Sequence, residues 1–155
     1  PDGEPIAVWE SGAILVYLAE KTGLFLSSVS AQRYETLAWV FFQMSGIGPM
    51  FGQLGVYVRG PGKDFEDKRP RQRFADESNR LLAVLDHRLE GRDWIVDDYS
   101  IADIATLGWV NALAGTYNAG DLVDFDAYAN VQTWLRRGLA RPAVQRGLLI
   151  PARPA

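Results

Sequence analysis

Apolar residues spaced as on one side of an α-helix recur through most of this chain. Between residues 70 and 89 they form one stripe of five: Phe74, Leu81, Leu82, Leu85 and Leu89. Similar spacing predicts helices over residues 11–22, 30–58, 100–113 and 128–141. Each apolar stripe needs a partner to cover it. The sequence therefore predicts a mostly α fold, with at least five helices in one bundle.

Composition narrows the classes of function. The net charge of −3 argues against a nucleic-acid-binding surface, which usually carries a basic excess. With no cysteine and one histidine in 155 residues, no metal site is expected. The longest apolar run, Leu37 to Phe42, is far shorter than the roughly 18 residues of a membrane span. We therefore expect a globular domain that binds neither nucleic acid nor membrane.

The front of the chain combines an apolar strand with a helix. Ile6 to Trp9 is predicted to be a strand, and a helix is predicted to start at Ser11 as N-cap and to stop at Gly23. A helix N-terminus can bind a carboxylate through its free N–H groups, and Glu10 could pair with an ammonium group. Glu10 and Ser11 could therefore bind the zwitterionic end of an amino acid. An ordinary capped helix with a surface glutamate is the alternative.

Two further helix starts are predicted from local signals. Ser30 is a candidate N-cap of the long helix that follows it. Ser100 and Asp103 have the spacing of a capping box. In a capping box the serine hydroxyl accepts a hydrogen bond from a backbone N–H in the first turn of the helix, and the acidic side chain accepts one from the backbone N–H of the serine. We interpret Asp103 as a structural cap and not as a catalytic acid. The helix after it is apolar nearly all round and is expected to be buried.

Four segments, in this order, resemble the cytosolic glutathione S-transferases. They span nearly the whole chain: Trp9–Ala19 (WESGAILVYLA), Phe42–Met50 (FQMSGIGPM), Tyr99–Ala105 (YSIADIA) and Arg141–Val144 (RPAV). The pattern is most similar to the bacterial nu class, which acts on glutathione disulfide and organic disulfides.

This resemblance implies a fold and a division of the chain. Residues 1–24 would be the last strand and helix of a thioredoxin-like domain, and residues 25–155 the all-helical C-terminal domain. Most of the thioredoxin-like domain would lie upstream. It would supply the catalytic residue, so none can be named in this chain.

The resemblance also implies an activity. Glutathione, as substrate or co-substrate and without a metal, would be held at its γ-glutamyl end by Glu10 and Ser11. The chemistry would be transfer of glutathione to a small electrophile or reduction of a disulfide. A cytoplasmic homodimer is implied. The alternative is a non-catalytic glutathione-transferase-like module for protein association.

Two features have a functional and a structural interpretation. Arg80 could reach a glutathione carboxylate within the subunit or across a dimer, or it could belong to a solvated helix face. Gly46, Gly48 and Pro49 interrupt the predicted helix over residues 30–58. The bend could open a cleft for the second substrate beside the glutathione site, or it could follow the core.

Overall fold

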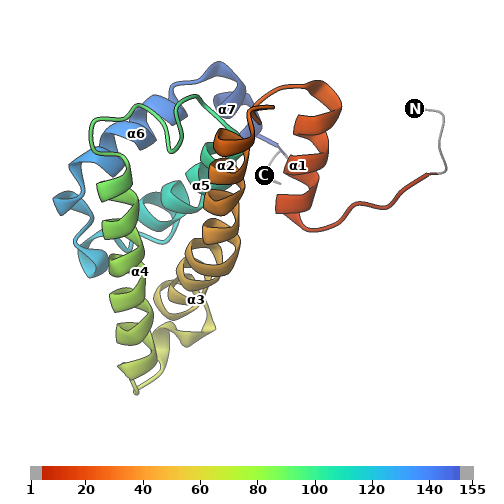
Figure 1. The fold of residues 1–155 in the computed structure, drawn as a ribbon. Helices are drawn as coiled ribbons and strands as arrows, with labels where there is room; N and C mark the ends of the chain where they lie inside the picture. The colour runs from red at the N-terminus through yellow and green to blue at the C-terminus, as the bar shows by residue number, and fades with distance from the viewer. Residues whose placement is uncertain (1–4, 151–155) are drawn as a thin grey trace.

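The computed structural model describes residues 5–150 and is a bundle of helices joined by short turns (Figure 1). The main helices are α1 (Ser11–Thr22), α2 (Ser30–Phe42), α3 (Gly48–Val58), α4 (Arg69–Arg88), α5 (Ile101–Asn111), α6 (Ala129–Leu139) and α7 (Pro142–Gly147). Within residues 5–150 no strand forms. The predicted mostly α fold is confirmed. The outer ends of the predicted 1–24 and 25–155 units lie outside the described residues, and the boundary between these units stays a prediction.

The predicted strand at Ile6–Trp9 is not formed. Residues 5–10 have no regular secondary structure, and Ile6 and Trp9 are 69% and 76% exposed. Within residues 5–150 no second strand is present to pair with this segment, and a lone strand cannot satisfy its backbone groups. The helix predicted after it is confirmed. It ends at Gly23, where φ is 69° and the N–H donates to the Ala19 carbonyl at 2.8 Å.

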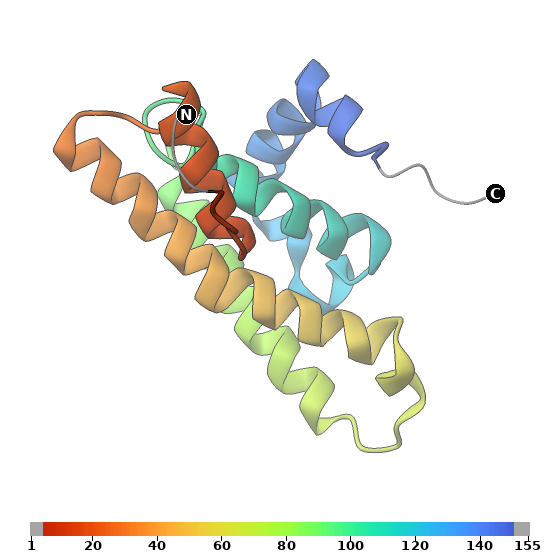
Figure 2. The ribbon, with the colours of Figure 1, turned by 90° about the vertical axis from the view of Figure 1, so that its right-hand side faces the viewer.

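The long helix predicted over residues 30–58 is interrupted where the glycines and the proline occur. A π-helical turn, Gln43–Ile47, separates α2 from α3, and Pro49 lies in the first turn of α3. Proline has no N–H to donate, so it is tolerated at that position. α2 and α3 follow one another as one long rod (Figure 2).

The core lies between this rod and the helices that follow it. α4 runs beside α3, and its predicted stripe is confirmed, because Leu81, Leu82 and Leu85 are fully buried. α5 contacts α1, α2 and α6, and Trp134 of α6 is fully buried. The prediction that α5 is buried all round is wrong on one side, where Ile104 and Trp109 are only half-buried.

Two of the three predicted N-caps are misplaced by one residue. Ser11 and Ser30 are the first residues of α1 and α2, the cap positions are Glu10 and Val29, and neither helix has a side-chain cap bond. The cap is set by the residue whose backbone leaves the helical conformation. Here that residue is the one before each serine.

The capping box at Ser100 is confirmed. The Ser100 hydroxyl accepts a hydrogen bond from the Ala102 N–H at 3.2 Å, and Asp103 Oδ2 accepts one from the Ser100 N–H at 3.0 Å. Asp103 also reaches beyond its own helix. Its Oδ1 accepts from the Ile95 N–H at 3.0 Å and from the Trp134 indole N–H at 2.8 Å. Burial raises the pKa of Asp103, and these donated hydrogen bonds partly oppose that rise.

Replacing Ser100 by alanine removes one half of this box. We expect Ser100→Ala to lower the free energy of unfolding by about 0.5–2 kcal/mol, because the Ala102 N–H loses its acceptor. Urea unfolding gives the stability. Calorimetry should show nearly unchanged affinity for a ligand bound elsewhere on the chain. A large loss of affinity at unchanged stability would contradict a purely structural role.

Candidate functional site

The N-terminal end of α1 has an uncommon backbone. Glu10 has φ 68° and ψ 124°, a conformation that costs a non-glycine residue on the order of 1–3 kcal/mol and tends to persist at functional sites. The Glu10 carbonyl still accepts the first helical hydrogen bond, from the Ile14 N–H at 2.9 Å. No side chain among the described residues caps the helix. The first-turn N–H groups are therefore available to an anion.

Glu10 and Ser11 are both exposed at this helix end, but they face different hollows. Ser11 borders a cavity of about 540 Å³ between α1 and α5, called here the α1–α5 cavity. Glu10 borders a cavity of about 490 Å³ between α1 and α2, called here the α1–α2 cavity. Met44 lines both cavities and separates them.

Met44 lies directly against the first turn of α1. Its sulfur is 3.8 Å from the Ser11 hydroxyl, and a Cβ at Gly12 would lie 3.0 Å from its terminal methyl carbon. Glycine at position 12 therefore leaves room for the π-helical turn to approach α1. Apart from this weak sulfur contact, the described residues give the Ser11 hydroxyl no hydrogen bond.

Most of the α1–α5 cavity is apolar. Apolar and aromatic residues of its lining come from α1, the π-helical turn, α5 and the residues just after α5: Ile14, Leu15, Met44, Ile104, Ala105, Trp109, Ala112 and Tyr117. Ser11, Gln43 and Tyr117 bring polar atoms to this lining. Gln43 is not among the site residues predicted from the sequence. The signal available was a polar residue between Phe42 and Met44, in a stretch that is otherwise apolar.

Arg80 is not brought to the end of α1. It lies on α4 and borders a separate hollow of about 730 Å³, which it shares with Met50, Arg69, Gln72, Arg73, Phe74, Asp76 and Glu77. Its guanidinium donates to both carboxylate oxygens of Glu77, at 2.8 and 2.7 Å, and these bonds lower the pKa of Glu77. A contact between Arg80 and a ligand at Ser11 in the same subunit is therefore not supported by this arrangement.

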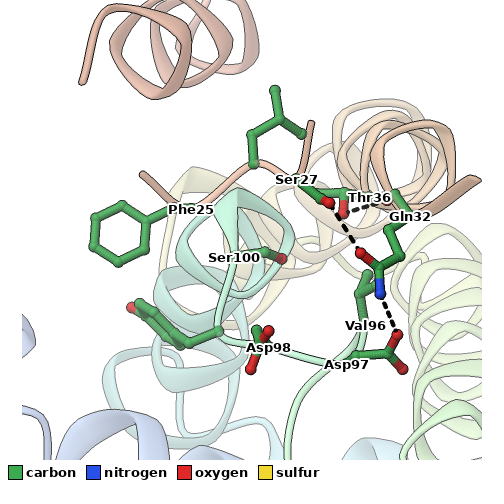
Figure 3. A pocket seen from close by; sticks show the side chains of 10 residues that line it. Phe25, Ser27, Gln32, Thr36, Val96, Asp97, Asp98 and Ser100 are labelled. Atoms are coloured by element: carbon green, nitrogen blue, oxygen red, sulfur yellow. Dashed lines mark hydrogen bonds between the residues drawn. The ribbon is translucent and has the colours of Figure 1, made fainter. Parts of the chain in front are cut away.

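A small cavity of about 220 Å³ lies where the linker after α1 meets the start of α2 and the loop before α5 (Figure 3). Within it the Ser27 hydroxyl donates to Gln32 Oε1 at 2.9 Å, and Gln32 Nε2 donates to Asp97 at 3.0 Å (Figure 3). This chain of bonds joins the linker and the start of α2 to the loop before α5, because Asp97 lies 65 residues after Gln32 in the sequence. The amide of Gln32 is already used at both ends, so the cavity is a structural junction.

Residues 5–150 contain neither a cluster of metal-ligating side chains nor a helix suited to cross a membrane. Within residues 5–150, no three histidine, cysteine, aspartate or glutamate side chains gather into a ligand set for a metal ion. Over the same residues, no helix is both long and apolar enough to cross a lipid bilayer.

The sequence of the bundle matches a known family. The family model described as "Glutathione S-transferase, C-terminal domain" matches residues 48–142, which is more than half of the chain. The chain belongs to the glutathione S-transferase family. The resemblance inferred from the four sequence segments is confirmed.

Two curated members of this glutathione S-transferase family from Escherichia coli K12 are similar over nearly all of the chain. Disulfide-bond oxidoreductase YfcG is 42% identical over 154 residues, which cover 95% of this chain and 66% of YfcG. Disulfide-bond oxidoreductase YghU is 39% identical over 150 residues, covering 94% of this chain and 51% of YghU. The chain thus spans about two thirds of the length of YfcG and about half of the length of YghU.

Solved glutathione transferases share the fold closely. The enzyme from Pseudomonas putida, with one glutathione disulfide bound per subunit, superposes with a TM-score of 0.96 at 58% identity, over 98% of this chain and 66% of that one. The enzyme from Burkholderia graminis, with two glutathione molecules per subunit, gives a TM-score of 0.95 at 57% identity, over 99% of this chain and 65% of that one. The helical bundle described above is therefore the glutathione S-transferase C-terminal domain.

Proposed function

We propose that this chain is part of a glutathione-dependent enzyme that transfers glutathione to an electrophile or reduces a disulfide through glutathione. The observation that carries the proposal is the uncapped N-terminus of α1, with exposed Glu10 and Ser11 and a strained backbone at Glu10. Glutathione disulfide and glutathione are bound in the similar Pseudomonas and Burkholderia enzymes, which supports the same ligand here.

In the proposed mechanism, α1 binds the γ-glutamyl end of glutathione. Its α-carboxylate would accept hydrogen bonds from the first-turn N–H groups and the Ser11 hydroxyl, where the helix dipole is positive. Its ammonium group would pair with Glu10. The α1–α5 cavity, beside Ser11, would take the second substrate. No residue of this chain is assigned to the step at sulfur.

Several other parts of the proposal come from the family. A thioredoxin-like domain would complete the site, with residues 1–24 as its last part, and the exposed apolar Ile6, Trp9 and Leu18 are suited to lie against it. The enzyme would be a cytoplasmic homodimer. Arg80 would contact glutathione across the dimer, after exchanging its bond to Glu77.

A non-catalytic module for protein association is the alternative function. It is less well supported, because such a module needs no free anion site.

The test is binding of glutathione disulfide to the full-length protein. We expect Ser11→Ala to weaken binding about tenfold or more, because a hydrogen bond to a charged carboxylate is lost. Isothermal titration calorimetry measures the affinity. Ser30→Ala is the matched control, since Ser30 is likewise the exposed first residue of a helix without a side-chain cap bond. Equal affinity of both variants, or no binding by the wild type, would contradict the proposal.

A further inference from the structure

The side chain of Met44 lies along the first turn of α1. A Cβ added at Gly12 would lie 3.0 Å from its terminal methyl carbon, 3.3 Å from its Cγ and 3.4 Å from its sulfur. The sulfur is also 3.8 Å from the Ser11 hydroxyl oxygen. Gly12 is buried and does not have a positive φ, so its backbone does not require glycine. Met44 instead fills the space that a side chain at position 12 would occupy.

A thioether beside Ser11 leaves the serine hydroxyl available to a ligand. Within residues 5–150 the Ser11 hydroxyl has no hydrogen-bond partner other than the Met44 sulfur. A thioether sulfur is a weak acceptor, whereas a carboxylate accepts a strong, charge-assisted hydrogen bond. The carboxylate of a ligand would therefore displace the sulfur at little cost. Until then, the contact with Met44 keeps the hydroxyl beside the end of α1.

Met44 also lies between the two side chains that are proposed to bind glutathione. It lines the α1–α5 cavity with Ser11 and the α1–α2 cavity with Glu10. The φ of Glu10 is 68°, and a non-glycine residue keeps such a strained conformation only where the surrounding structure holds it. The packing of Met44 against the next two residues, Ser11 and Gly12, is a contact of this kind.

We propose that Met44 is a positioning residue, whose side chain supports the first turn of α1 in the arrangement that binds the γ-glutamyl end of glutathione. This inference rests on the proposed function, and it adds a residue of the π-helical turn to the glutathione site. Such turns are frequent at functional sites. Met44 acts on the ligand only through Ser11 and Gly12. Its role needs no open surface, so a thioredoxin-like domain lying over the α1–α5 cavity would leave that role unchanged.

The test is calorimetric titration of glutathione disulfide into variants of the full-length protein. We expect Met44→Ala to weaken binding about fivefold, because Ser11 and the first-turn N–H groups lose their support. Met44→Leu keeps most of the side-chain volume and should bind within about twofold of the wild type. Gly12→Ala should also weaken binding about fivefold, because its Cβ displaces the Met44 side chain. Gly147→Ala, at a helical glycine where a Cβ would meet open space, should leave the affinity unchanged.

A double variant and a stability measurement separate this role from a general loss of structure. Gly12→Ala should keep the free energy of unfolding, because alanine favours a helix and the flexible end of Met44 can move. Its loss of affinity should disappear in the Met44→Ala background, where the space is vacant.

Four results would overturn the inference while the wild type still binds and the proposed function stands. They are an equal effect of Gly12→Ala in both backgrounds, marked destabilisation by Gly12→Ala, unchanged affinity in Met44→Ala, and failure of Met44→Leu to restore binding. Absence of glutathione disulfide binding by the wild type would overturn both the inference and the proposed function.

Discussion

Asp103→Asn is expected to lower the free energy of unfolding by about 3 kcal/mol. Oδ1 accepts from the Ile95 N–H and the Trp134 indole, and Oδ2 from the Ser100 N–H and hydroxyl. An asparagine keeps only one oxygen. The NH₂ group that replaces the other oxygen is itself a donor and cannot accept a hydrogen bond. The buried N–H groups that faced this oxygen therefore lose their acceptor. Denaturant unfolding followed by circular dichroism measures the loss.

Asp98→Asn is the matched control for this experiment. Asp98 lies in the same loop before α5 but is exposed, so the same chemical change should alter stability by no more than about 0.5 kcal/mol. If the two variants lost similar stability, the loss would come from removing a negative charge and not from the buried hydrogen bonds.

Asp86→Ala is expected to lower the free energy of unfolding by about 2 kcal/mol. Asp86 lies on α4 but caps α6: its Oδ1 accepts from the Asn130 and Val131 N–H groups, at 2.9 and 3.0 Å. Oδ2 accepts from the Asn130 side-chain amide at 3.0 Å. α6 has no side-chain cap from its own preceding residue. The alanine variant therefore leaves its first turn without an acceptor.

Two further variants, measured by thermal or urea unfolding, show whether the stability loss in Asp86→Ala comes from the hydrogen bonds or from the charge. Asp86→Asn should lose less stability, because its amide oxygen can still accept from both backbone N–H groups. Asp126→Ala removes an exposed acid a few residues before α6 and should change little. A similar loss in Asp126→Ala and Asp86→Ala would mean that the charge near the helix acts without the hydrogen bonds.

The features predicted correctly from sequence are those fixed by neighbouring residues. Ser100 and Asp103 are three residues apart, so their capping box needs no information from elsewhere in the chain. The break in the long helix was predicted from Gly46, Gly48 and Pro49 for the same reason. The apolar stripe of α4 is likewise a local pattern, and it is buried as predicted.

The features that were missed depend on distant residues or on one backbone angle. The strand at Ile6–Trp9 needed a partner strand that residues 5–150 do not provide. The positive φ of Glu10 moved the cap away from Ser11. The cap that Asp86 gives to α6 spans 44 residues, so no local motif marks it. The contact between Met44 and Ser11 joins residues 33 positions apart, so it became apparent only once both were placed.

The π-helical turn absorbs one residue without changing how α2 and α3 are phased relative to each other. A π turn holds one residue more than the α-helical turn it replaces, but both complete one turn of the helix. A single deletion within residues 43–47 would therefore restore a regular helix and leave the phase of α3 nearly unchanged. Phe51 and Leu54, now fully buried, would stay in the core. In this family member the length of the segment between Phe42 and Gly48 is thus less constrained than the identity of the core residues.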